Sequence, residues 1–153
     1  MVRLSDLAPQ VAQGLLNLPL PEFISTPWTQ PRPLREARIA IVTTAGLHRR
    51  SDAKFVGGAA DYRIIPDDVD PAEIIMSHVS VNFDRSGFQQ DVNVVFPLDL
   101  LRDLAARREI GSVARWHYSF MGATDPTRLQ DSAMQLAKLL RDDHVDGAIL
   151  IPV

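Results

Sequence analysis

The sequence predicts a layered α/β domain with a mostly parallel sheet and βαβ units, preceded by a proline-rich N-terminal extension. The first supporting observation is the continuous apolar run "ARIAIVTTAG" at 37–46, which ends in glycine and is typical of a strand buried on both faces. The second is a strand–helix–strand pattern over 115–153. Such a unit implies parallel neighbouring strands and a right-handed crossover, and alternating strands and helices build layered α/β domains.

Length and composition restrict the class of protein. A chain of 153 residues fits one domain that buries roughly 70% of its unfolded surface. The net charge of −3 provides no field for nucleic acid or anionic lipid. No apolar stretch approaches the ~20 residues that span a bilayer, and the N-terminus lacks a secretory signal, so we expect a cytoplasmic protein with neither nucleic acid nor membrane as partner. The absence of cysteine excludes disulfides, zinc thiolates and thiol nucleophiles within these residues.

We divide the chain into an extension at 1–36 and an α/β domain at 37–153, and we expect the domain to be incomplete at its C-terminus. The extension begins with a helix that has Ser5 as its N-cap. The apolar face of this helix is formed by Leu7, Val11, Leu15 and Leu18. Five prolines between 19 and 33 then predict an extended strap. Large apolar side chains at 23, 24 and 28 favour docking of the strap on the body, and disorder is the alternative.

The first half of the domain has short elements. A buried strand at 38–44 is followed by a polar, glycine-rich loop at 47–61 and a short strand at 62–66. In "DPAEII", Asp70 is an N-cap with proline at the next position, which predicts the start of a compact helix. The alternating segment 76–96 breaks at Gly87 and predicts two short extended pieces.

The second half contains the stronger periodic patterns. A helix is expected over 97–109, with Gly111 as its stop. A strand at 115–122 and a helix beginning at 125–126 follow. The chain then closes with "VDGAILIPV", an apolar, β-branched run that predicts another buried strand.

The predicted ligand site lies at the carboxyl ends of the strands, where ligands bind in open α/β sheets. The first strand end provides Thr43, Thr44, Gly46 and His48. The second provides Gly122 and Thr124 at a helix N-terminus, where free N–H groups favour an anion. The third strand end is Val153, so the terminal carboxylate would lie in the same crevice.

The histidines are the main candidates for acid–base chemistry. No two of them are spaced as i, i+3 or i, i+4, so no helix-borne metal site is predicted. We select His48, which follows a strand end, and His78, for which Asp84 can serve as an orienting carboxylate. A loop hydrogen-bonding cluster is the alternative for His78. We interpret His117 as structural and His144 as a charge partner at a helix C-terminus.

The order of several segments supports a family resemblance. These segments are "VTTAGLH", "YRIIP", "SHVSVNFD", "DVNVVFPLDLLRDLA", "IGSVARWHYSFMG" and "HVDGAILIPV". They resemble the selenoprotein B family of the glycine, sarcosine, betaine and D-proline reductases, especially its short stand-alone bacterial members. The likeness runs from about residue 38 to 153, and "NVVFPLDLLRDLA" followed by "HYSFMG" is its most specific portion.

The resemblance implies a redox residue directly after Val153. In that family the corresponding strand leads into a loop with selenocysteine or cysteine, and a selenocysteine codon is read as a stop in gene prediction. Selenocysteine is therefore expected at position 154, with further α/β structure after it, and no other cofactor bound in this chain. A selenol is ionised at neutral pH and is nucleophilic, like a thiolate. It would attack a carbon bearing an activated amine and break the C–N bond, and a thiol would then resolve the product.

The same resemblance implies roles for the site residues and for partners. The substrate would be a small amino-acid-like molecule or carboxylate, and the reductant a thiol protein or small thiol. His48 would donate a proton or stabilise the anion, and N–H groups after Gly122 would hold a substrate carboxylate. The family's reductases also use partner subunits with a pyruvoyl group, which nothing in this chain supplies.

Two rival functions are compatible with the same sequence. The first is a redox-inactive α/β module that binds a small anionic molecule in the crevice. The second is a structural or regulatory subunit that pairs through a sheet edge or the proline-rich strap, including pairing into a homo-oligomer. The codon at position 154 separates both rivals from the reductase, and thermal stabilisation by carboxylates separates the rivals from each other.

Overall fold

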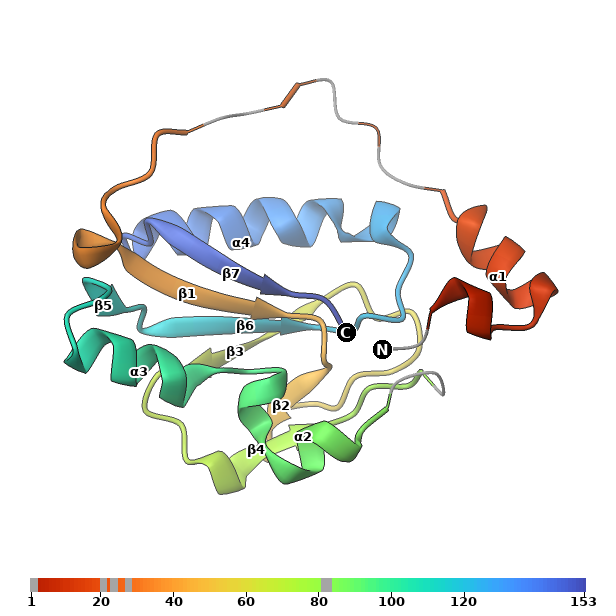
Figure 1. Ribbon diagram of the computed structural model, residues 1–153, viewed down its shortest axis with the longest axis horizontal. Coiled ribbons are helices and arrows are strands. Elements are labelled where there is room, and N and C mark those ends of the chain that lie inside the picture. The colour runs from red at the N-terminus through yellow and green to blue at the C-terminus, as the bar shows by residue number, and fades with distance from the viewer. Residues whose placement is uncertain (1–2, 20–21, 23–24, 27–28, 81–83) are drawn as a thin grey trace.

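The computed structural model describes residues 3–19, 22, 25–26, 29–80 and 84–153 (Figure 1). The three large side chains of the strap at 23, 24 and 28 lie outside these ranges, so their expected docking stays a prediction. The extension contains α1 (Pro9–Leu16), which carries no buried residue. Its N-cap is Ala8, and Ser5 instead lies in the preceding 3₁₀ turn, so the predicted cap is wrong.

The main sheet has five strands and is mostly parallel, which confirms the predicted fold class. Its strands are β1 (Arg38–Thr43), β3 (Tyr62–Pro66), β5 (Ser112–Val113), β6 (Trp116–Phe120) and β7 (Gly147–Ile151). β5, β6 and β7 all run parallel to β1, and β3 pairs antiparallel with β6. A second, two-stranded antiparallel sheet joins β2 (Leu47–Arg49) to β4 (Ile74–Met76).

The βαβ unit is present, but its two strands are not neighbours. β6 leads through α4 (Gln130–Asp142) to β7, and β1 lies between the two strands. The expectation of adjacent strands is therefore wrong, although both strands are parallel to β1. The crossover helix α4 packs against β6, where Leu136 clusters with Tyr118 and Phe120.

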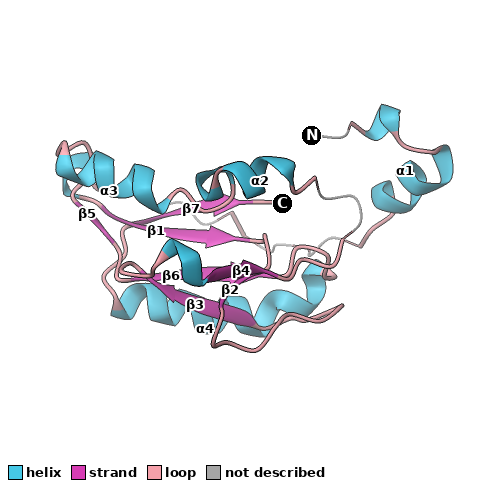
Figure 2. Ribbon diagram, turned by 90° about the horizontal axis from the view of Figure 1, so that it is seen from below, coloured by secondary structure: helices cyan, strands magenta, loops and turns pink. Residues whose placement is uncertain are grey.

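Helices cover both faces of the sheet. α3 (Leu98–Ala106) and α2 (Ser86–Gln90) lie on one face, and α4 lies on the other (Figure 2). On the α3 face, Leu98 and Leu101 pack into a cluster with Ile41 and Phe96. On the α4 face, a smaller cluster surrounds Leu136. These two apolar layers make the interior of a three-layer α/β domain.

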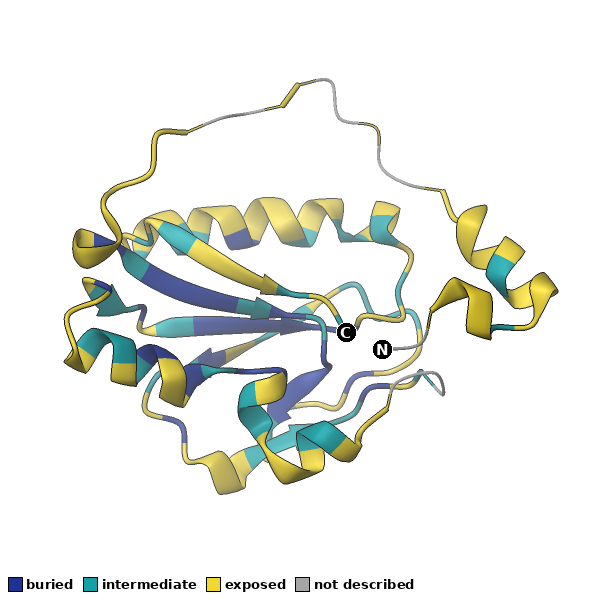
Figure 3. Ribbon diagram, in the orientation of Figure 1, coloured by how far each residue is buried: buried dark blue, intermediate teal, exposed yellow. Residues whose placement is uncertain are grey.

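Burial differs sharply between the strands. β1 and β6 are mostly buried, whereas β7 is exposed through its middle (Figure 3). Leu150 is 72% exposed and Ile149 is 38% exposed. The predicted buried strand at the end of the sequence is therefore a strand whose outer edge pairs with no other strand in the described part of the chain.

Three further expectations are corrected by the structure. The segment 76–96 begins with the last residue of β4 and then forms α2 and a 3₁₀ turn (Val92–Val94), so its described residues contain no pair of strands. The helix expected from Asp70 is a single 3₁₀ turn (Pro71–Glu73), although Asp70 does cap it. α3 ends at Ala106, before Gly111, because Arg108 takes the left-handed conformation (φ 60°) that terminates it.

The remaining short turns have local causes. Asp125 caps the turn Pro126–Leu129, which leads into α4 as expected. Two other 3₁₀ turns, Leu4–Asp6 and Leu34–Glu36, belong to the extension. Within the described ranges, no helix combines the length and apolar character that crossing a membrane requires.

Candidate functional site

Three parallel strands end together at Thr44, at the carboxyl edge of the sheet. The Thr44 N–H donates to the carbonyl of Ile151 at 3.0 Å, which attaches β7. The Thr44 carbonyl accepts the N–H of Gly122 at 2.8 Å, which attaches the end of β6. Its hydroxyl oxygen accepts the N–H of Val153 at 2.8 Å. Pro152 has no N–H to donate, so the ladder cannot continue there and the threonine side chain takes over.

Gly122 lies where three groups converge. A Cβ atom at Gly122 would lie 2.7 Å from the carbonyl oxygen of Val153, 2.9 Å from that of Thr44 and 3.0 Å from Nε2 of His78. Real Cβ atoms do not approach backbone so closely, so this position needs glycine. Gly122, Thr44, Val153 and His78 thus lie close together, and we name these four residues the strand-end site.

Gly46 explains how His78 reaches the strand-end site. Gly46 has φ +66° and its N–H donates to the carbonyl of Phe120 at 2.8 Å. The Gly46 carbonyl accepts the N–H of Ser77 at 3.0 Å, and a Cβ at Gly46 would lie 3.0 Å from the backbone nitrogen of His78. Glycine therefore permits the left-handed turn and the close backbone approach that place the imidazole over the strand ends.

The hydrogen bonds of His78 favour a neutral ring with its proton on Nε2. Nδ1 of His78 accepts the N–H of Ser80 at 3.2 Å, which leaves Nε2 as the protonated nitrogen. The ring is buried, and burial together with the nearby Arg85 cation lowers the pKa of His78. The Arg85 guanidinium also donates to the His78 carbonyl. At neutral pH the ring is therefore neutral, with its protonated Nε2 beside Gly122.

Thr43 and Thr124 make contacts that hold the backbone in place. Thr43 is fully buried, and its hydroxyl oxygen accepts the N–H of Ala45 at 3.2 Å. The Thr124 hydroxyl donates to the carbonyl of Ala59 at 2.7 Å, which fastens the loop before β3. The N–H groups of Ala123 and Thr124 have no hydrogen-bond partner among the described residues.

The side-chain hydrogen bonds of His48 and Asp84 go to residues outside the strand-end site. His48 is buried in β2, with Nδ1 2.8 Å from the carbonyl oxygen of Arg49. Asp84 accepts both the N–H and the hydroxyl of Ser86, at 2.9 and 2.7 Å, beside the start of α2. The carboxylate of Asp84 is therefore used to shape the chain next to α2.

Arg85 is the contact of His78 that the sequence pattern does not identify. Nothing in the sequence distinguishes Arg85 from the chain's other cations, because its approach to His78 depends on the path of the loop.

Metal ligation finds no support in the described ranges, where no three His, Cys, Asp or Glu side chains gather in a way that could hold an ion.

The fold and the strand-end site together define an α/β protein that holds a strand end beside an imidazole, where open sheets bind ligands. Comparison with known sequences gives the particular family. The chain matches the glycine/sarcosine/betaine reductase selenoprotein B (GRDB) family over residues 15–152, and it belongs to that family.

Two curated relatives are reductase subunits. The chain is 30% identical over 154 residues to the D-proline reductase subunit gamma of Acetoanaerobium sticklandii, covering 96% of this chain and 61% of the relative. It is 29% identical over 140 residues to the betaine reductase complex component B subunit beta of Peptoclostridium acidaminophilum, covering 88% and 32% respectively. The chain thus spans less than two thirds of either relative. No solved structure matches it.

Proposed function

We propose that this chain is part of a selenocysteine- or thiol-dependent reductase whose redox residue directly follows Val153. The observation that carries the proposal is the attachment of Val153 to Thr44 beside His78. The Val153 N–H is held at 2.8 Å by the Thr44 hydroxyl oxygen, and its carbonyl lies next to Gly122. Membership of the selenoprotein B family and the names of both relatives support a reductase-complex subunit.

The residues present fit a selenolate or thiolate at this position. Such a group supplies the nucleophile for cleavage of a C–N bond or a related thiol-linked reduction. Gly122 lets the carbonyls of Val153 and Thr44 and Nε2 of His78 come close together, which leaves no room for a side chain at that position. His78 thus lies beside the end of the strand, where its Nε2–H can donate a hydrogen bond to an anion on the residue after Val153 and pass its proton to a leaving nitrogen. We assign the proton to His78 rather than His48 because of this contact with Gly122.

The substrate in this proposal is a small amino-acid-like molecule or carboxylate. The free N–H groups of Ala123 and Thr124 lie directly after Gly122, ahead of the capped turn at Asp125, and they suit a carboxylate. A thiol protein or small thiol serves as reductant. The location proposed for the complex is the cytoplasm.

The first test is to read the coding DNA beyond codon 153. A UGA codon followed by an open frame that encodes further α/β pattern is the expected result. Any other stop codon, or no open frame, would overturn the proposal.

The second test uses the chain continued through its own downstream frame with cysteine at position 154. We expect saturating iodoacetamide to label that thiol, with an apparent pKa below the usual ~8.5. His78→Phe should slow labelling at pH 7 by about tenfold, since one hydrogen bond to a charged group is lost. His48→Phe is the matched control and should change little. Equal rates for both variants would reject the role of His78.

A further inference from the structure

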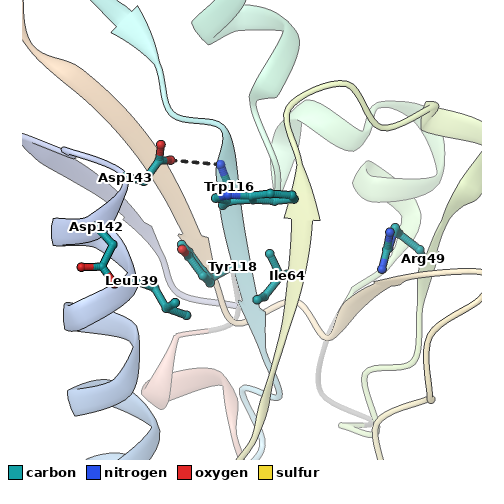
Figure 4. Close-up of a pocket in the computed structure, with 7 residues that line it drawn as sticks. All are labelled: Arg49, Ile64, Trp116, Tyr118, Leu139, Asp142 and Asp143. Atoms are coloured by element: carbon teal, nitrogen blue, oxygen red, sulfur yellow. Dashed lines mark hydrogen bonds between the residues drawn. The ribbon is translucent and has the colours of Figure 1, made fainter.

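A hollow with different chemistry lies at the opposite end of β6 from Gly122. It is bounded by the sheet and the C-terminal end of α4, with a volume of about 450 Å³ (Figure 4). Its main lining residues are Ile64, Trp116, Tyr118, Leu139, Asp142 and Asp143. Trp116 and Tyr118 are the first and the middle residue of β6, whereas the strand-end site lies beyond the last residue of that strand. Its volume is in the range of small-molecule pockets.

The hydroxyl of Tyr118 is a polar group without a partner in this hollow. Tyr118 is only 1% exposed, yet its hydroxyl makes no hydrogen bond to any described residue. The hydroxyl points toward α4 (Figure 4). Burial, with the negative charges of Asp143 and Asp142, raises the pKa of Tyr118 to about 12, so the phenol stays protonated. The hydroxyl oxygen itself is not sealed inside the protein, so it can contact a polar atom bound in the hollow.

One of the two carboxylates in the hollow, that of Asp143, already accepts hydrogen bonds from other groups of the protein. Asp143 accepts the guanidinium of Arg38 at 2.6 Å and the backbone N–H groups of Arg115 and Trp116 at 2.9 and 3.2 Å. Its charge is balanced by Arg38, and its lone pairs are occupied. Asp143 therefore shapes the hollow and has little capacity for a ligand.

The negative charge of Asp142 is not balanced by a cation. Its carboxylate forms no ion pair and no hydrogen bond within the described part of the chain. The cation that also lines the hollow, Arg49, is already paired with Asp52 at 2.9 Å. The Arg115 guanidinium lies 5.0 Å from the centroid of the Trp116 ring, so one face of that indole already contacts a cation. The lining thus offers one unpaired carboxylate beside the remaining indole surface and aliphatic side chains, a combination that attracts organic cations.

We propose that this hollow binds a small alkylammonium ion. The ammonium group lies between the Asp142 carboxylate and the Tyr118 hydroxyl oxygen, to which it donates hydrogen bonds. The alkyl part packs on Trp116 and Leu139. The unpaired hydroxyl favours an ammonium with N–H groups, because a fully substituted nitrogen would leave that oxygen without a partner.

Tryptophan fluorescence provides a direct test. The chain has two tryptophans, so a Trp28→Phe background isolates the emission of Trp116. Titration with n-butylammonium chloride at constant ionic strength should give a saturable change. 1-Butanol, a neutral molecule of similar size, and butyrate should give none. Asp142→Asn should weaken binding by about fivefold, the scale of one exposed ion pair. Tyr118→Phe should weaken it as well.

Asp131→Asn is the matched control. It removes the same charge from an exposed position in the first turn of the same helix and should leave butylammonium binding unchanged. Equal weakening by Asp131→Asn and Asp142→Asn, or equal binding of 1-butanol, would overturn the proposal. Circular dichroism checks that each variant folds. The measurement needs no redox residue and no turnover, so its result is independent of the reductase proposal.

Discussion

His117 is an ionisable side chain in the middle of the sheet, and its contacts fix its protonation state. Its Nδ1 accepts the N–H of Ile41 at 3.0 Å, so the neutral ring carries its proton on Nε2. The ring is fully buried and lies perpendicular to Phe96 at a centroid distance of 5.6 Å. Burial lowers the pKa of His117 to about 4, against an opposing contribution from Asp143, while Arg102 and Arg38 lower it further.

This pKa predicts that stability falls as the solution is acidified. The unfolded chain binds a proton at His117 below pH ~6.5, whereas the folded chain resists it until about pH 4. The contribution of the neutral ring is therefore complete above pH ~6.5 and is lost between these values, amounting to about 3 kcal/mol. Urea unfolding at pH 7, 5.5 and 4.5 measures this loss.

His117→Asn should remove much of the pH dependence, because the amide oxygen can replace Nδ1 as acceptor but does not titrate. His144→Asn is the control, since His144 is exposed in the turn after α4. If His117→Asn leaves the slope of stability against pH unchanged, another group is responsible for the acid sensitivity.

Sequence alone can identify some residues of the strand-end site. Thr44 and Gly122 are predictable, because each lies within two residues of the end of an apolar strand and parallel strands end at one edge. His78 is recognisable as a candidate, but its position depends on the pairing of β2 with β4 and on the left-handed turn at Gly46. These are non-local features that composition and periodicity do not encode. The same limit explains why Asp84 could be chosen as a partner of His78, although it contacts Ser86.

At the scale of elements, Asp143 joins the end of α4 to two strands. It is the C-cap residue of the helix, and its carboxylate accepts two N–H groups at the start of β6 as well as the Arg38 guanidinium from β1. The Asp143 side chain is only 12% exposed. This carboxylate therefore sets the distance between the crossover helix and the sheet.

We expect Asp143→Asn to destabilise the fold by about 1.5–3 kcal/mol, since hydrogen bonds to a charged, largely buried group are weakened. Chemical denaturation at pH 7 measures the change. Asp142→Asn alters the neighbouring exposed carboxylate and should stay within about 0.5 kcal/mol. Similar losses for both variants would show that general charge at the helix end, rather than these bonds, is responsible.

Helices of eight or more residues were easier to predict than the short turns. The periodic apolar positions of α3 and α4 identify both helices. Between 76 and 96, alternating apolar and polar residues suggested strands, but Asp91 accepts the N–H of Asn93 at 2.9 Å and folds the chain into a 3₁₀ turn. Such a local side-chain bond competes with extended structure without changing the hydrophobic pattern.

For the molecule as a whole, the exposed outer edge of β7 is the main solubility risk. Leu150 and Ile149 are exposed along a strand whose outer edge pairs with no other strand among the described residues, and such edges pair with other chains. We predict that the described chain self-associates with increasing concentration and that Leu150→Lys suppresses this. Because the Leu150 side chain is 72% exposed, the melting temperature should shift by no more than about 2 °C.

Sedimentation velocity at a series of concentrations tests the edge prediction. Leu100→Lys is the control, because Leu100 is 56% exposed on α3, away from the strand edge. If both lysine variants reduce association equally, general apolar surface is the cause. If neither does, β7 is not the interface.

The layered α/β class could be predicted because apolar runs and helix periodicity are local patterns. The position of β1 between β6 and β7 could not, since sequence neighbours are adjacent in a sheet in only roughly two thirds of cases. Exposure of the last strand also depends on what pairs with its outer edge, which no pattern within the strand specifies. Local sequence patterns therefore predict the layers of the domain, whereas the order of the strands in the sheet depends on long-range pairing.

The shared bonds of Thr44 also have a consequence for motion. One residue holds the end of β7, the second residue after β6 and the backbone of Val153. Loosening any of these segments weakens the anchor of the others, so their amide hydrogens should exchange with solvent in one cooperative opening event. The backbone at Val153 thereby acquires the rigidity of the central strand, even though it lies beyond the last paired residue of an exposed edge.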